Sequence, residues 1–109
     1  MILITCEELK EKLDKEENFK LVNVLEEWNF RAKRIPGSIH LNKPEKAEEI
    51  LDKKDEIVVY CTNVSCVASI IAYRMLVQNG YENVCRFAGG LEAWEEAGLP
   101  LEGEMVDDK

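Results

Sequence analysis

The chain has 109 residues, 46% of them apolar and 33% charged, which is typical of one soluble globular domain with a single core. Its formal net charge is −8, and because nucleic acids and anionic membranes bind clustered cations, the composition argues against both as partners. No apolar stretch approaches the roughly 20 residues of a membrane span, and nothing resembles a signal peptide, so we expect a cytoplasmic protein with reduced thiols.

The first half of the chain alternates helical and strand-like segments. Thr5 followed by Glu8 is a capping-box pattern, which predicts a helix to about Leu13. A short β-rich run follows, and a Pro-Gly turn precedes a second brief strand. In chain order, we expect strands at 19–25 and 38–41 and helices at 26–34 and 44–52.

The second half continues this alternation around its most apolar strand. Residues 56–61, EIVVYC, contain four consecutive apolar side chains, as in a strand that is buried on both faces. We expect next a helix that ends at Gly80, a strand at 83–87, a short helix, and a frayed acidic tail at 101–109. The chain, 1–109, is then a single α/β domain: a parallel sheet flanked by helices on both faces.

Cys61 stands where the apolar strand gives way to a helix. In parallel α/β sheets the functional crevice lies beyond the carboxyl ends of the strands. Free backbone N–H groups and the positive end of a helix dipole gather at such a junction, and both favour a thiolate. Thr62, Asn63 and Ser65 add polar side chains that can cap the helix or line the loop. Position alone supports two interpretations equally, a nucleophile and a small buried residue.

Four stretches, in order along nearly the whole chain, resemble the rhodanese family: LVNVLEEWNFRAKRIPGSIHLN, IVVYC, NGYENV and AGGLEAWEEAGLPLE. The resemblance implies a rhodanese-like, sulfurtransferase-type α/β fold in its single-domain form. It also implies that Cys61 matches the family cysteine that carries sulfur as a persulfide. The partners implied are a small sulfane-sulfur donor and a thiol or protein acceptor, and we expect neither a cofactor nor a metal.

The loop departs from the family pattern C-x-x-G-x-R. Val64 stands at the glycine position and Cys66 at the arginine position, so the loop is a C-x4-C variant. It contains no arginine, and the nearest one downstream is Arg74 in the expected helix. Thiosulfate, a dianion, then lacks charge-assisted hydrogen bonds, so we expect weak turnover of thiosulfate with cyanide. The family's phosphatase branch is excluded because Val67 replaces its arginine and the loop offers only backbone dipoles.

Cys66 has two interpretations. It is either a buried residue in the first turn of the helix or a second thiol close to Cys61, able to attack a persulfide or sulfenic acid there and form a disulfide. Zinc binding is less well supported, because C-x4-C lies at the wide edge of ligand spacings and no second pair follows. The usual Asp and Arg of the family are replaced by Asn23 and Leu25, which is consistent with an altered site.

The remaining candidates have structural explanations. His40 is expected to make a structural hydrogen bond rather than act as a general base, and Cys6 and Cys85 are expected to be core or partly buried thiols. Three aromatic side chains are expected in the core: Trp28, Phe30 and Trp94. A basic cluster is expected either to be solvated or to attract an anionic partner: Arg31, Lys33 and Arg34.

Two functional classes follow from these observations. The first is a sulfurtransferase in which Cys61 carries sulfane sulfur and passes it to a thiol acceptor, with Cys66 available as a resolving thiol. The second is a non-catalytic sulfur carrier or redox-responsive interaction module of the same fold. The residues expected to form the substrate-binding loop are Thr62, Asn63, Val64, Ser65 and Val67.

Overall fold

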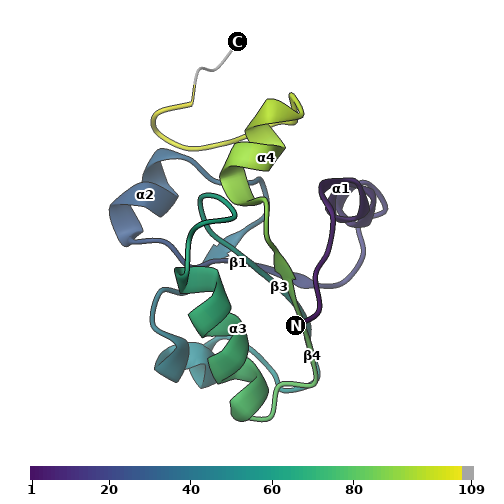
Figure 1. Cartoon of the computed structure of the whole chain (residues 1–109), viewed down its shortest axis with the longest axis vertical. Coiled ribbons are helices and arrows are strands. Elements are labelled where there is room, and N and C mark those ends of the chain that lie inside the picture. Colours follow the sequence, from purple (N-terminus) through teal and green to yellow (C-terminus); the bar gives the residue numbers. More distant parts are fainter. Residues whose placement is uncertain (107–109) are drawn as a thin grey trace.

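The computed structural model describes residues 1–106, and its centre is a four-stranded parallel sheet. The strands are β1 (Lys20–Asn23), β2 (Ile39–His40), β3 (Glu56–Tyr60) and β4 (Asn83–Phe87). They lie in the order β2-β1-β3-β4 (Figure 1). β3 has a neighbour on each side, and residues 57–60 are all buried, as the apolar run predicted.

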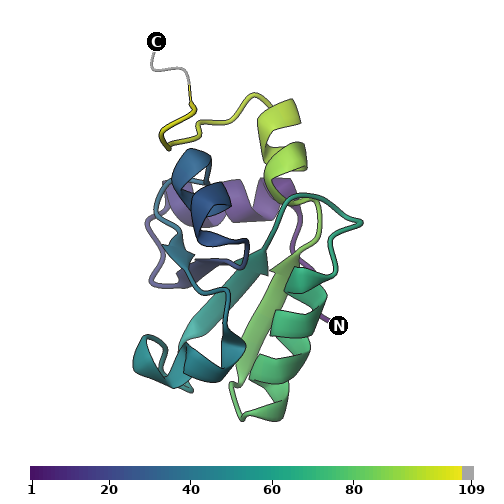
Figure 2. The same ribbon diagram turned by 90° about the vertical axis from the view of Figure 1, so that its left-hand side faces the viewer.

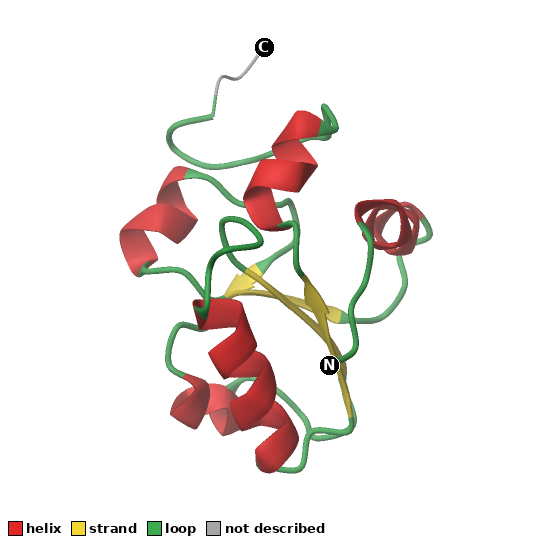
Figure 3. Ribbon diagram, viewed as in Figure 1, coloured by secondary structure: helices red, strands yellow, loops and turns green. Residues whose placement is uncertain are grey.

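Helical segments connect the strands (Figure 3). They are α1 (Cys6–Asp14), α2 (Glu27–Ala32), the 3-10 helix η1 (Pro44–Glu49), α3 (Ala68–Gln78) and α4 (Gly90–Glu96). α1 begins with the predicted capping box, in which the Thr5 side chain accepts from Glu8 N and the Glu8 carboxylate accepts from Thr5 N. The helix expected at 44–52 is a shorter 3-10 helix. Within residues 1–106, no helix is long and apolar enough to span a membrane.

Helices cover both faces of the sheet, which confirms the predicted architecture. α3 and η1 pack on one face, over a core that includes Val59 and Cys61 (Figure 1). α1 and α4 pack on the other face, over a core that includes Tyr60 and Trp94 (Figure 2). Because successive strand residues point to opposite faces, Cys61 shares the α3 side with Val59.

Two predictions about parts of the chain outside the sheet are wrong. Trp28 is 69% exposed on α2 instead of filling the core, whereas Trp94 is 1% exposed, as predicted. Residues 101–106 are not frayed: they return across α2 (Figure 2), where Arg34 and Glu102 exchange backbone hydrogen bonds. Residues 107–109 of the predicted tail lie outside the described part of the chain.

The basic cluster is neutralised by three ion pairs: Arg31–Glu104, Lys33–Glu95 and Arg34–Glu102.

The Tyr60 hydroxyl joins the two central strands to the segment before β2. It accepts hydrogen bonds from Asn23 Nδ2 and from Ile35 N, both at 3.1 Å, and donates to Ser38 Oγ at 2.9 Å. Asn23 Oδ1 also accepts from Leu25 N at 2.9 Å. Asn23, Ile35 and Tyr60 are fully buried, so Asn23 has a structural hydrogen-bonding role.

We expect Tyr60→Phe to lower the free energy of unfolding by about 1–3 kcal/mol, because two buried N–H donors lose their acceptor while the core volume is kept. Urea denaturation measures the change. The matched control is Tyr73→Phe, whose hydroxyl accepts a hydrogen bond from Ile2 N at an exposed site. An equal loss in both variants would show that the Tyr60 network adds no stability.

Candidate active site

Cys61 directly follows β3 and is held in place by the N-terminus of α4. The N–H groups of Leu91 and Glu92 donate to the carbonyls of Cys61 and Thr62, at 2.9 and 2.8 Å. Gly90 permits this approach, because it has φ of 61° and an added Cβ would lie 2.8 Å from the carbonyl carbon of Thr62. The start of the loop is therefore fixed by a helix that lies about thirty residues further along the chain.

Residues 62–67 form the loop between β3 and α3 (Figure 3). Asn63 organises it, since its Oδ1 accepts from Ser65 N at 3.0 Å and its backbone carbonyl accepts from Cys66 N at 3.1 Å. The Asn63 side chain also donates to Glu92 Oε2 at 3.2 Å. These polar residues line the loop and do not cap α3, which begins without a side-chain cap.

Cys66 lies in the loop and not in the helix. α3 begins two residues later, at Ala68, so the interpretation of Cys66 as a first-turn helical residue is wrong. The structure joins Cys61 and Cys66 in a disulfide, with their Cα atoms 6.5 Å apart. Cys61 is 1% exposed, whereas Cys66 is half-buried. An external thiolate therefore reaches the sulfur of Cys66 more easily than that of Cys61.

Arg86, which the sequence patterns did not indicate as a site residue, reaches the loop from β4. Its Nε donates to Ser69 Oγ at 2.8 Å, and its Nη2 donates to the carbonyls of Val64 and Cys66 at 3.4 Å each. Ser69 Oγ in turn lies 3.4 Å from Cys61 Sγ. The expectation that the loop offers only backbone dipoles is wrong, because a guanidinium lies beneath it. The sequence feature that could have indicated Arg86 is a charged residue within the otherwise apolar strand pattern VCRF.

The other two cysteines are partly buried, as predicted, and pack on the opposite face of the sheet. Burial raises the pKa of the Cys85 thiol to about 11; the charge of Lys12 opposes this shift, and the carboxylates of Glu56 and Glu8 add to it. Burial and the charge of Glu7 also raise the pKa of the Cys6 thiol. Both therefore stay protonated at neutral pH, and a protonated thiol is a poor nucleophile.

His40 makes the structural hydrogen bond predicted for it. Its Nε2 lies 2.6 Å from the carbonyl oxygen of Leu25, and because a carbonyl can only accept, Nε2 carries the proton. The imidazole also stacks on Phe30, with ring centroids 5.0 Å apart. These contacts tie β2 to the start of α2.

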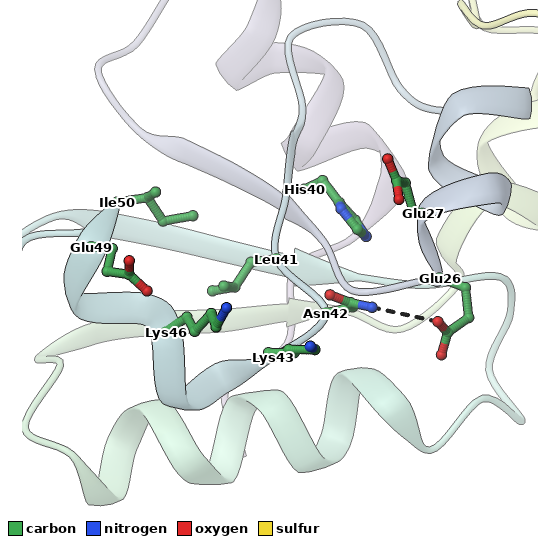
Figure 4. Close-up of a pocket in the computed structure, with 9 residues that line it drawn as sticks. All are labelled: Glu26, Glu27, His40, Leu41, Asn42, Lys43, Lys46, Glu49 and Ile50. Atoms are coloured by element: carbon green, nitrogen blue, oxygen red, sulfur yellow. Dashed lines mark hydrogen bonds between the residues drawn. The ribbon is translucent and has the colours of Figure 1, made fainter.

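Two surface clefts lie near the carboxyl ends of the strands. One, of about 550 Å³, contains side chains of both charges (Figure 4). Its lining residues are Glu26, Glu27, His40, Leu41, Asn42, Lys43, Lys46, Glu49 and Ile50. The other, of about 450 Å³, is lined by Thr62 of the cysteine loop, the exposed Trp28 and the buried Leu91. The second cleft borders the cysteine loop through Thr62, and neither cleft is lined by Cys61 or Cys66.

The fold and the loop define a parallel α/β domain with a cysteine at a strand-to-helix junction. The chain matches the model of the rhodanese-like domain over residues 5–97 and belongs to that family. Thiosulfate sulfurtransferase GlpE of Actinobacillus succinogenes is 34% identical over 88 residues, covering 79% of this chain and 78% of that protein. The putative sulfurtransferase YtwF of Bacillus subtilis is 34% identical, covering 84% and 88%. The Alr3790 structure from Anabaena has a TM-score of 0.84 at 27% identity, with 94% of each chain covered.

We predict that the Cys85 thiol stabilises the folded protein at neutral pH and that this stabilisation is lost at alkaline pH. Its pKa is about 11 in the folded protein against an ordinary value of 9.0, so the folded state holds the proton more tightly. That contribution is complete below about pH 9 and is lost as the pH rises toward 11. The free-energy gap between wild type and Cys85→Ala, measured by urea denaturation in reductant, should therefore narrow above pH 9. A gap that stays constant up to pH 10.5 would contradict the prediction.

Proposed function

We propose that the protein is a sulfurtransferase that carries sulfane sulfur as a persulfide on Cys61 and passes it to a thiol acceptor. The observation that supports this most is the pairing of Cys61 with Cys66 at the carboxyl end of β3, above a buried arginine. The raised pKa values of Cys6 and Cys85 leave Cys61 and Cys66 as the candidates for thiolate chemistry.

The reaction has two steps. The Cys61 thiolate attacks the sulfane sulfur of the donor, a new S–S bond forms, and the donor leaves with the electron pair of its broken bond. An acceptor thiolate then attacks the outer sulfur of the persulfide and releases the Cys61 thiolate. When Cys66 is the attacking thiolate it bonds to the Cys61 sulfur instead. The products are then hydrosulfide and the Cys61–Cys66 disulfide, which an external thiol must reduce before the next cycle.

We expect reduced wild-type protein to gain one sulfur atom from a persulfide donor, at Cys61. Intact-mass and peptide mass spectrometry measure the adduct. Cys61→Ser should abolish it, whereas Cys66→Ser should prolong its lifetime, because the intramolecular resolving thiol is gone. Cys85→Ser is the matched control and should leave both yield and lifetime unchanged. A full yield of adduct in Cys61→Ser would refute the assignment.

Thiosulfate should be a poor donor, with turnover about tenfold or more slower than with a persulfide, because charge-assisted hydrogen bonds to the dianion are missing. Arg86 does not supply them, since it is 5% exposed and faces the underside of the loop. Cyanolysis rates measure the difference. Cys66→Arg and Cys66→Ser form a matched pair that lose the same thiol, and only the first adds a cation to the loop. Fast wild-type turnover at micromolar thiosulfate would disprove this explanation.

The alternative is a sulfur carrier without turnover of its own. A relative named putative sulfur carrier protein YrkF, from Bacillus subtilis, is 30% identical over 93 residues that cover 84% of this chain and 49% of that protein. A carrier would accept one sulfur atom on Cys61 and hold it until a partner protein removes it. Stoichiometric loading without release to small thiols would favour the carrier over the enzyme.

A further inference from the structure

Arg86 is a buried cation without a matching anion. Arg86 is 5% exposed, and none of the ion pairs within residues 1–106 includes its guanidinium. Removing a guanidinium from water is costly unless nearby acceptors or an opposite charge compensate for it. The recorded acceptors are neutral: the Ser69 hydroxyl and two carbonyl groups of the cysteine loop. An anion close to Arg86 would complete the compensation.

The Ser69 hydroxyl connects Arg86 to the sulfur of Cys61. Because Arg86 Nε donates to Ser69 Oγ at 2.8 Å, the oxygen acts as an acceptor there and its own proton is free to point elsewhere. Cys61 Sγ lies 3.4 Å from Ser69 Oγ, and because a disulfide sulfur carries no proton, the hydroxyl is the group that can donate in this contact. A hydroxyl that accepts from a cation is a stronger donor, since linked hydrogen bonds polarise one another. Ser69 is 1% exposed, so water does not compete for the contact.

We infer that Arg86, acting through the Ser69 hydroxyl, stabilises the Cys61 sulfur as an anion. Arg86 is then a positioning residue, and Ser69 is the group that touches the reacting sulfur. The inference deepens the proposed function, because stabilising this anion assists sulfur transfer only if Cys61 carries the sulfur. The two contacts place Arg86 Nε within about 6 Å of Cys61 Sγ, inside the range over which an opposite charge favours ionisation.

The other charged groups around the loop do not cancel this effect. Glu92, on α4, contacts the loop through Asn63 and is exposed, so water and salt screen its carboxylate. Arg74, on α3, is also exposed. On the β1 side, Asn23 and Val24 are uncharged. Arg86 is the buried charge among these groups and acts in the lowest dielectric.

The same contact makes Cys61 the favoured leaving group when the disulfide is reduced. An external thiolate attacks the half-buried Cys66 sulfur, forms a mixed disulfide with it, and breaks its bond to Cys61. The electron pair of that bond goes to Cys61 Sγ, next to Ser69. Stabilising the departing thiolate accelerates this step, because a better leaving group leaves faster.

The test is the pH dependence of alkylation at Cys61 in the reduced, sulfur-free protein, with iodoacetamide as the probe and site-resolved mass spectrometry as the readout. Arg86→Leu should move the midpoint upward by about one pH unit or more, because a nearby opposite charge lowers such a pKa by about 1–3 units. Ser69→Ala should move it in the same direction. Arg86→Lys keeps a charge and should restore part of the shift. Arg74→Leu, the matched control at an exposed arginine, should leave the midpoint unchanged.

An unchanged midpoint in a folded Arg86→Leu protein, checked by circular dichroism, would overturn the inference. If that variant does not fold, Ser69→Ala decides, and an unchanged midpoint there overturns it as well. The measurement needs no sulfur donor, so a result that overturns the inference about Arg86 does not by itself overturn the proposed function. A shifted midpoint without persulfide formation on Cys61 would support the anion site and reject sulfur transfer.

Discussion

The close approach of Gly90 to the backbone of Cys61 and Thr62 is the constraint on which the site depends. The N–H groups of Leu91 and Glu92 in α4 donate to the carbonyls of Cys61 and Thr62, just beyond β3, and a side chain at position 90 would collide with those carbonyls. The Cys61 sulfur lies on the α3 side of the sheet, beside Ser69, at the edge where ligands of parallel sheets bind.

The sheet register explains why Arg86 meets the same loop. β3 and β4 are parallel neighbours, and Val59 pairs with Arg86. Cys61 lies two residues beyond Val59, so all three side chains point to one face. Arg86 can therefore reach beneath the loop from its own strand, whereas Cys85 points to the opposite core, where burial raises its thiol pKa. Cys85 and Arg86, neighbours in β4, therefore contribute to opposite faces of the sheet.

The fold was predictable from local patterns, but the polar partners of the site were not. Alternating strands and helices, the capping box at Thr5 and the apolar run before Cys61 each depend on neighbours in sequence, which the printed chain displays directly. Arg86 acts across the sheet, and its contact with Ser69 follows only from the strand order and register. The prediction for Trp28 was wrong for a related reason: α2 buries none of its residues, which its own sequence does not show. Residues 101–106 likewise dock through backbone hydrogen bonds and ion pairs to a segment that is distant in sequence.

The oxidation state of the cysteine pair also sets the charge of the site. In the disulfide neither sulfur carries a charge, and Arg86 is compensated only by neutral acceptors. A thiolate or persulfide anion at Cys61 would supply the missing negative charge through Ser69, and it would do so in a region from which water is largely excluded. The cost of burying Arg86 is then smaller in the reduced form than in the disulfide. On the inference drawn above, a buried cation on β4 would therefore favour opening of the disulfide in the neighbouring loop.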